Sequence, residues 1–492
     1  MGGAGVLSAR SLAAAAAAVA LAATAACTPV TDGRGGTPRS ASSPGPARSS
    51  ARSSGSASAP AGRSGCPTSY AAPDPHRPRV DLIFTVDSSL RTVHGIENVA
   101  FTPDKPITEL VFRLTANTAP TVAEGNRIVV TTARADHGAG RYTFRPAGAA
   151  PSTQGGLLVI PFRRKVAAGT TVQARVEFTV TLGANSFDRF GTAGHFAYFG
   201  SAEPLLAWER GFGWHTENMI DFPAESATSE AMDVDLTVTA PPQYTVIMSG
   251  DPGRPLQYGA TRTWHSTIST ARDVSVAVGP FAVADTVVDA GGKQVRLRVG
   301  APTPAIRDAL VPQFRLALTK LAQRYGPYPF PSLSVARLPA QGGGIEYPSS
   351  ILMLDGSRLV AVHETAHQWF YAMVGDSQAL HPWLDEAFAQ YSEQLVDGTP
   401  ENPAALRSPG PVDASTESYG TAEQSYYFTT YDKGSAALEA ARRAAGAPAW
   451  DAALRCYVAA NAWRIANPAD LAFALRKLPA AVAVLRKAGA LR

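Results

Sequence analysis

The sequence predicts a multidomain α+β protein in which an antiparallel β-sheet domain precedes a mainly helical α/β domain. Apolar and polar residues alternate with a period of two from about Val80 to Val299, as is typical of half-buried strands. After about Pro302 the period becomes helical. Because 492 residues can form two or three domains with separate cores, we expect the sheet domain over residues 78–301 and the helical α/β domain over residues 302–492.

The N-terminus has the features of an export signal, which we predict over residues 1–26. Arg10 lies in a short basic region, and the Ala-rich apolar stretch Leu12–Ala23 is too short to span a membrane. Ala25-Ala26-Cys27 then resembles a bacterial lipobox, although Thr24 replaces the usual leucine. We expect export and a lipid anchor at Cys27 on the outer face of the bacterial cytoplasmic membrane. The alternative is ordinary secretion after cleavage near Ala26.

The segment after the signal is predicted to be a disordered tether, which together with the lipidated Cys27 covers residues 27–77. It consists of Ser, Pro, Ala, Gly and Arg with almost no aliphatic side chains. Such a composition buries too little apolar surface to offset the entropy of ordering the chain. Cys66 and Cys456 could form one disulfide in an oxidising compartment, but two unpaired thiols remain an equal alternative.

The β half contains several segments in which apolar and polar residues alternate strictly. They lie at residues 80–86, 172–182, 232–239 and 295–299. Clusters of Gly, Pro and Asp separate them, as at residues 249–253. The pattern predicts antiparallel strands with one buried face.

The second half is predicted to consist mainly of helices. An amphipathic helix over Ile306–Tyr325 ends at Gly326-Pro327, and a strand follows over Leu333–Leu338. Further helices are predicted over Arg358–Val374, Pro382–Leu395, Tyr431–Ala445 and Trp450–Trp463.

The predicted helix over 358–374 carries the pattern HExxH at residues 363–367. Residues four apart lie on one face of a helix, so His363 and His367 can share one zinc ion. Apolar residues beside this face place both imidazoles next to the core, at the wall of a cleft. The pattern alone should arise by chance in on the order of one chain in a hundred of this length, so it needs a second signal.

The second signal is Glu386, on the next predicted helix within the run Trp383–Ala389. Two histidines and one carboxylate leave a fourth zinc position open for water, as in catalytic zinc sites. We therefore predict one Zn²⁺ per chain, bound by His363, His367 and Glu386. The alternative is a pair of helical histidines without a metal.

Glu364 lies between the two histidines in sequence, about 100° round the helix from His363. A carboxylate there can accept a proton from the attacking water and pass it to the leaving amine. We predict Glu364 to be the catalytic base; the alternative is an ordinary surface glutamate.

With these residues the sequence resembles the aminopeptidase N family of gluzincin zinc metallopeptidases. The matching elements are Gly343–Pro348, His363–His367, Trp383–Ala389 and Tyr431–Gly434, and the run Tyr325–Pro331 resembles the stretch that precedes the family's catalytic strand. The resemblance covers roughly residues 80 to 480. It implies an N-terminal β-sheet domain followed by a thermolysin-like α/β zinc metallopeptidase domain.

The resemblance also implies roles for residues outside the zinc motif. Glu346 matches the acidic residue that binds the free α-amine of the substrate, and Gly343 and Gly344 belong to the same substrate-binding strand. Tyr431 matches the tyrosine that stabilises the oxyanion, where a phenol that stays protonated at neutral pH is a suitable donor. Without the resemblance, Glu346 would be taken for a loop carboxylate and Tyr431 for a packed aromatic. Glu393, on the same predicted helix face as Glu386, could contact a ligand histidine, but a solvated glutamate is a similar alternative.

Two departures from the family pattern concern the substrate site. The usual Met-Glu-Asn is Ile345-Glu346-Tyr347 here, so the carboxylate is kept and an amide is lost. The large C-terminal helical domain of many relatives is expected to be absent.

The sequence therefore predicts a zinc metallopeptidase, most simply an aminopeptidase that takes peptides as substrates. The alternatives are an endopeptidase with the same zinc centre and a non-catalytic binding lipoprotein that kept the fold. The strand before Glu346 is expected to offer its edge to an extended peptide. A net charge of only +4 gives no reason to expect nucleic acid as a partner, whereas the anchor at Cys27 predicts a membrane.

Overall fold

The computed structural model describes residues 66–492 apart from 185–187, 224, 226–227 and 400–401. The predicted signal peptide, Cys27 and most of the predicted tether lie outside these residues. In the described part of the chain, no helix has the length and apolar character needed to cross a membrane.

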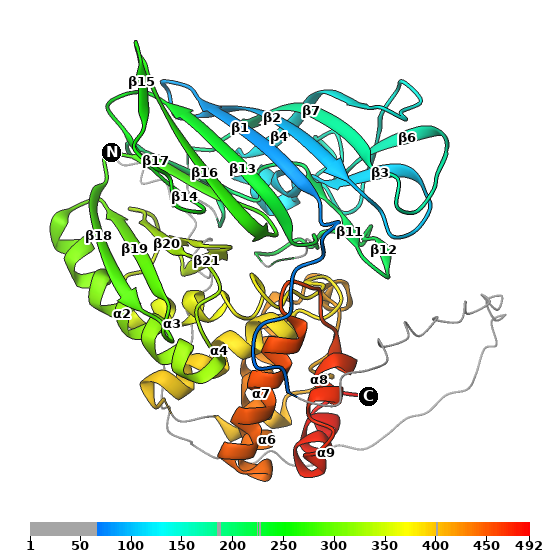
Figure 1. Cartoon of the computed structure of the whole chain (residues 1–492), viewed down its shortest axis with the longest axis vertical. Helices are drawn as coiled ribbons and strands as arrows, with labels where there is room; N and C mark the ends of the chain where they lie inside the picture. The colour runs from blue at the N-terminus through cyan, green and yellow to red at the C-terminus, as the bar shows by residue number, and fades with distance from the viewer. Residues whose placement is uncertain (1–65, 185–187, 224, 226–227, 400–401) are drawn as a thin grey trace, which may run out of the picture. The chain divides into compact units, whose positions relative to one another are not determined.

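A seven-stranded sheet dominates the N-terminal half (Figure 1). Its strands lie in the order β15 (Leu256–Tyr258), β16 (Thr261–Ala271), β13 (Met232–Ala240), β1 (Arg79–Val86), β2 (Thr92–Phe101), β7 (Val172–Thr181) and β4 (Arg127–Ala135). Buried and more exposed residues alternate along β1 and β13, as the sequence predicts. One pair differs from the expected antiparallel arrangement, because β1 and β13 run parallel. Parallel pairing is possible there because more than a hundred residues, including β2 and β7, connect the two strands.

Smaller sheets complete this half. One has the order β10 (Leu205–Leu206), β3 (Ile107–Arg113), β6 (Leu157–Val166) and β5 (Thr143–Arg145). Another has the order β14 (Thr245–Met248), β17 (Ser275–Gly279), β9 (Phe196–Gly200) and β8 (Phe190–Ala193), and β11 (Trp208–Glu209) pairs with β12 (Gly213–Trp214). Aromatic rings join the sheets, since Phe84 of β1 contacts both Phe178 of β7 and Phe199 of β9.

A five-stranded sheet carries the second half. Its order is β18 (Ala282–Asp289), β19 (Gln294–Ala301), β20 (Ser332–Arg337), β22 (Ser350–Met353) and β21 (Gly344–Tyr347). The boundary expected near residue 302 therefore passes through a hydrogen-bonded sheet, which begins at Ala282. Alternation at residues 295–299 identifies β19 as a strand but does not say which sheet it joins. Strand β21, which carries Glu346, is one of the two edge strands of this sheet. The expectation that the strand before Glu346 offers its edge is wrong, because β20 pairs with β19 on one side and β22 on the other.

The main helices are α2 (Pro304–Tyr325), α3 (Arg358–Ala366), α4 (Trp383–Asp397), α6 (Gly434–Ala445), α7 (Ala447–Asn461), α8 (Pro468–Ala474) and α9 (Pro479–Lys487). Two expectations need correction. The helix predicted over 358–374 ends at Ala366, and Tyr371 follows with φ of 109°. The helix predicted to start at Tyr431 starts at Gly434, because Tyr431 lies in a π-helical turn over Phe428–Lys433.

The first described residues correct the predicted tether, because they pack on the protein rather than forming a free chain. Cys66 and Cys456 of α7 form a disulfide, and Ala71 N–H donates to the carbonyl of Ala459. The hydroxyl of Tyr70 accepts from the indole N–H of Trp369 over 3.3 Å. Composition predicts the average behaviour of a segment, whereas residues 66–71 are held by a covalent bond, hydrogen bonds and the partly buried side chain of Tyr70.

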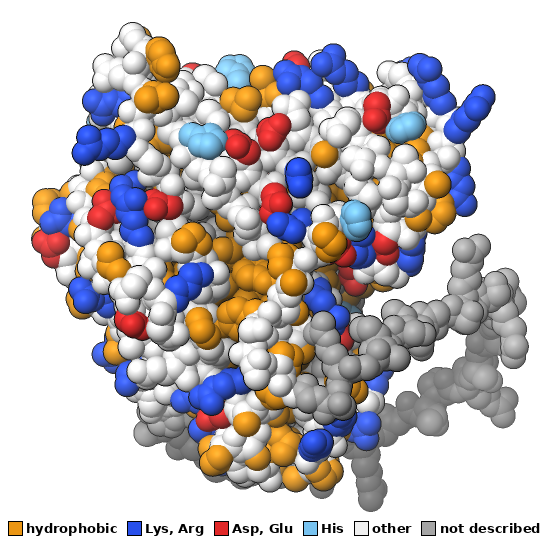
Figure 2. All heavy atoms as spheres, in the orientation of Figure 1, with side chains coloured by type: hydrophobic (Ala, Val, Ile, Leu, Met, Phe, Trp, Pro, Cys, Tyr) orange, Lys and Arg blue, Asp and Glu red, His pale blue; other side chains and the backbone are white. Residues whose placement is uncertain are grey.

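Arg272 of the β half joins the two halves behind the HExxH segment. Its buried guanidinium donates to the carbonyls of Tyr371, at 2.8 Å, and of Arg464, at 2.9 Å. Gly375 permits this approach, since a Cβ there would lie 2.1 Å from Cζ of Arg272. The described residues belong to one compact unit. On the face shown in Figure 2, basic and acidic side chains are interspersed.

Candidate metal centre

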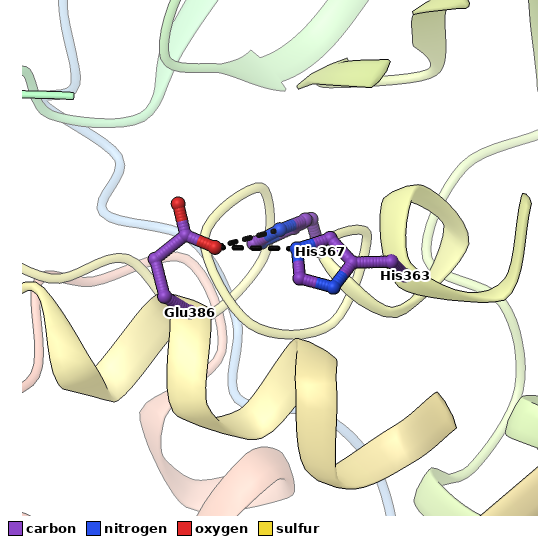
Figure 3. A group of neighbouring side chains, drawn as sticks. All are labelled: His363, His367 and Glu386. Atoms are coloured by element: carbon purple, nitrogen blue, oxygen red, sulfur yellow. Dashed lines mark hydrogen bonds and ion pairs between the residues drawn. The ribbon is translucent and has the colours of Figure 1, made fainter. Parts of the chain in front are cut away.

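Helices α3 and α4 position the three predicted metal ligands. The hydroxyl of Ser357 caps α3 by accepting from Val360 N–H, and His363 follows in the last turn. His367 lies at the C-cap, immediately after the last helical residue. Glu386 lies in the first turn of α4, and Figure 3 shows its carboxylate pointing at both imidazoles.

The three side chains converge as the sequence predicts. Oε2 of Glu386 lies 3.2 Å from Nε2 of His363 and 3.5 Å from Nε2 of His367 (Figure 3). One ligand atom from each of the three residues lies within 4.8 Å of the other two. Two imidazole nitrogens and a carboxylate oxygen are ligands that zinc prefers, so these residues fit a single metal ion.

The second ring nitrogen of each histidine, Nδ1, is hydrogen-bonded to a carboxylate. Nδ1 of His363 lies 2.5 Å from Oε1 of Glu393, which confirms the contact considered for Glu393. Nδ1 of His367 is hydrogen-bonded to Asp385, whose second oxygen accepts from Gln378 over 3.2 Å. These bonds orient both rings so that Nε2 faces Glu386, the arrangement found around metal-binding histidines.

The carboxylates create a negative potential at the site. Burial alone would lower the pKa of His363, but hydrogen bonds to Glu386 and Glu393 outweigh burial and raise it to about 10. Burial would raise the pKa of Glu386, but hydrogen bonds to both histidines hold it well below its usual value. A site with this potential favours a bound cation.

Glu364 is a buried carboxylate beside the metal ligands. The side chain is 4% exposed, and Oε2 has no hydrogen-bond partner among the described residues. Burial, opposed by His363 and His367, raises its pKa to about 7. Gly344 of β21 allows the approach, since a Cβ at this position would lie 2.4 Å from Cγ of Glu364. Gly344 thus has a steric role toward Glu364 that the sequence does not reveal.

Tyr431 lies against the open side of His363. The two rings are nearly parallel, with centroids 6.1 Å apart and 8° between their planes. Tyr431 lies in the π-helical turn Phe428–Lys433, and such turns are frequent at functional sites. Burial holds the pKa of its phenol well above the ordinary value, so the hydroxyl remains a donor at neutral pH.

Glu346 completes the group from the other side. It lies on edge strand β21 and is 5% exposed. One of its carboxylate oxygens lies within 4.8 Å of a ring nitrogen of His367 and an oxygen of Asp385. Burial raises its pKa well above the ordinary value, and the nearby Glu225 raises it further. Gly343 holds the start of β21, because its carbonyl accepts from Leu354 N–H and Asp355 N–H.

The comparisons with known families agree with this geometry. Residues 349–486, which contain α3 and α4, match the peptidase family M1 domain. The predicted resemblance to the aminopeptidase N family is thereby confirmed.

The chain also has relatives among curated proteins. It is 26% identical over 180 residues to endoplasmic reticulum aminopeptidase 1 of Homo sapiens, and this match covers 30% of this chain and 19% of that protein. Over 179 residues it is 25% identical to aminopeptidase M1-B of Oryza sativa subsp. japonica, covering 30% of this chain and 20% of that protein. The chain matches about a fifth of the length of these relatives.

Solved structures resemble the chain beyond the M1 domain. The M1 zinc metallopeptidase of Deinococcus radiodurans superposes with a TM-score of 0.62 and 21% identity, covering 84% of this chain and 94% of that one. A two-domain M1 zinc metallopeptidase mutant bound to L-arginine superposes with a TM-score of 0.63 and 20% identity, covering 84% and 93%. The predicted fold class, a β-sheet domain followed by an α/β metallopeptidase domain, is confirmed.

Two residues of the M1 domain site were not predicted to contribute. Asp385 lies in the predicted run Trp383–Ala389, but the run itself gives it no role. Gln378 lies in the loop between α3 and α4, where the sequence has no periodicity that would predict which way a side chain points. A signal for Asp385 is its place next to Glu386 on α4, because a carboxylate beside a ligand can reach a ligand histidine.

Proposed function

We propose that the protein is a zinc metallopeptidase that removes N-terminal residues from peptides. The observation that carries this proposal is the convergence of His363, His367 and Glu386, with a carboxylate on the far nitrogen of each histidine. A non-catalytic binding protein does not need this arrangement together with a buried, unpartnered Glu364.

The proposed chemistry divides among the residues already described. His363, His367 and Glu386 would hold one zinc ion per chain, which when bound acts as a Lewis acid toward water and the peptide carbonyl. Glu364, with a pKa of about 7, accepts the proton of the attacking water and returns it to the leaving amine. Tyr431 donates a hydrogen bond to the oxygen that becomes negative.

An aminopeptidase needs a group that recognises the free α-amine, and Glu346 is suitably placed. Its carboxylate lies beside His367, within a buried environment where attraction to an ammonium group is stronger than in water. Edge strand β21 leaves one side free to pair with an extended peptide. The human relative is named an aminopeptidase, and an M1 zinc metallopeptidase of Deinococcus radiodurans has been solved with a Tyr-Ser-Ala substrate.

A pair of substrates tests the proposal against the endopeptidase alternative. The wild type should hydrolyse aminoacyl fluorogenic peptides and leave their N-acetylated counterparts almost uncut. Glu346→Ala should raise KM sharply for the free-amine peptides and change little for the acetylated ones. Rapid internal cleavage of N-acetylated peptides by the wild type would identify an endopeptidase. No zinc-dependent cleavage of either peptide would refute the peptidase function.

We further propose that the protein is exported and lipid-anchored at Cys27. The lipobox-like Ala25-Ala26-Cys27 supports this, and the disulfide between Cys66 and Cys456 suits an oxidising compartment. Wild-type protein should enter the detergent phase of a phase-separated extract, and Cys27→Ser should not. Wild-type protein in the aqueous phase would refute the anchor.

A further inference from the structure

Gln368 links the metal-binding segment to the strand that carries Glu346. It directly follows His367, and its side chain is completely buried. Its Nε2 donates to the carbonyl of Tyr347 over 2.9 Å, and its Oε1 accepts from Ser349 N–H over 2.9 Å. Both bonded groups belong to the turn that joins β21 to β22.

This turn needs support from outside. Tyr347 pairs with Ser350, so only Pro348 and Ser349 form the loop. Ser349 has φ of 61°, a conformation that costs a non-glycine residue free energy. Its N–H is bonded to Gln368, and its hydroxyl donates to the carbonyl of Ser332 over 2.6 Å. These two bonds hold the strained residue in place.

Strand β21 has few other restraints near the turn to β22. As an edge strand, β21 pairs with β22 and with no other strand among the described residues. The ring of Tyr347 packs on Gly200 of β9, where a Cβ would lie 2.1 Å from Cζ of Tyr347. The backbone of Tyr347 is therefore held by Gln368 and its side chain by the β half. Glu346 is the preceding residue, so its position depends on both.

We propose that Gln368 is a positioning residue that sets the distance between Glu346 and the metal ligands. The same short segment carries His367 and Gln368, so a ligand and the support of Glu346 move together. This spacing fixes the α-amine one residue from the bond to be cut, and the inference therefore rests on the proposed aminopeptidase function. Loss of the two amide hydrogen bonds should relax that register without removing the metal.

The test compares Gln368→Met with Tyr328→Phe. The methionine keeps the length of the side chain and removes both hydrogen bonds to the turn. The control removes a buried hydroxyl that donates a hydrogen bond to Oε1 of Gln368 over 3.1 Å, but leaves both hydrogen bonds between Gln368 and the turn. Each variant and the wild type are assayed for zinc content, Tm and kcat/KM on an aminoacyl peptide and its N-acetylated form.

Gln368→Met should keep its zinc and lower the free-amine to N-acetyl preference about tenfold or more, mainly through KM for the free-amine peptide. Tyr328→Phe should change that ratio by less than about threefold, even if its Tm falls as far as the Tm of Gln368→Met. L-arginine probes the amine site without turnover. Its Kd, measured by calorimetry, should be higher for Gln368→Met than for the wild type. Gln368→Glu, which keeps the shape but loses the donor to Tyr347, replaces the methionine variant if that variant does not fold.

An unchanged preference ratio in a zinc-loaded Gln368 variant would overturn the inference, as would an equal loss in Tyr328→Phe. Failure of the proposed function is distinct, because the wild type itself would then cleave neither peptide or prefer the acetylated one.

Discussion

Two groups of buried carboxylates lie in different halves of the molecule, and their surroundings differ. At the metal centre, Asp385 and Glu393 each accept a hydrogen bond from a histidine. In the β half, Glu97 and Glu203 are 2% and 3% exposed, and each keeps an oxygen without a hydrogen-bond partner among the described residues. Burial is similar in the two groups, but the partners are not.

Different partners shift the pKa of Glu386, at the metal centre, and that of Glu203, in the β half, in opposite directions. Burial and then the neighbouring Asp273 raise the pKa of Glu203 to about 8, so this carboxyl is largely protonated at neutral pH. Glu386 is as deeply buried, yet hydrogen bonds from two histidines hold its pKa well below the ordinary value. Hydrogen bonds from basic partners, as at Glu386, keep a buried acid ionised and suited to a metal ion, whereas burial without such partners, as at Glu203, does not.

The largest expected effect is loss of the metal. Glu386→Ala removes one of three ligands and should leave almost no zinc after dialysis against a chelator, since two ligands rarely retain it. Glu203→Gln, which alters a buried carboxyl of the β half instead, should leave one zinc per chain. Full zinc occupancy in Glu386→Ala would show that Glu386, like Glu203, is not needed to hold zinc, and would contradict the account.

A smaller effect is expected from the carboxylates that orient the histidines. Asp385→Asn should weaken zinc affinity by roughly 10–100-fold, because His367 then loses its anionic acceptor. Glu393→Gln should weaken it less, since the Glu393 and His363 side chains are 11% and 14% exposed and the Asp385 and His367 side chains only 1% each. Competition against a fluorescent chelator measures both affinities. The reverse order would show that burial does not set the strength of this support.

The smallest effect concerns stability. The folded pKa of Glu203 is raised from 4.5 to about 8, so its contribution to stability is complete below pH 4.5 and is lost as pH rises through about 8. Glu203→Gln cannot ionise, so its Tm relative to the wild type should rise by a few degrees between about pH 5 and 9. In Asp273→Asn the corresponding rise should occur at lower pH, because the pKa of Asp273 is about 6. Parallel Tm curves for the wild type and Glu203→Gln would contradict a protonated Glu203.

The sequence was sufficient for the elements with strong local patterns. Alternation gave the strands of the β half, and the HExxH spacing with Glu386 gave three residues that the structure brings together. The rest depends on tertiary contacts that leave no periodic signal. Nothing local assigns β18 and β19 to the second sheet, because that choice depends on parallel pairing with β20 across helix α2.

The early end of α3 has a similar origin. Residues after Ala366 have the composition of a helix, but the chain turns at Tyr371, where its carbonyl accepts from Arg272 of the other half. Cys66 and Cys456 are far apart in sequence, so spacing alone could not decide whether they pair. In both cases the deciding partner lies in a distant part of the chain.

Peptide hydrolysis by wild type and Glu364→Gln, both verified to hold zinc, tests the central claim most directly. The amide keeps the size of the side chain but cannot accept the proton of the attacking water. We predict that kcat for an aminoacyl fluorogenic peptide falls by about 10²–10⁴-fold in Glu364→Gln while its zinc content stays at that of the wild type. A zinc-loaded Glu364→Gln with nearly wild-type kcat would contradict the account of this site.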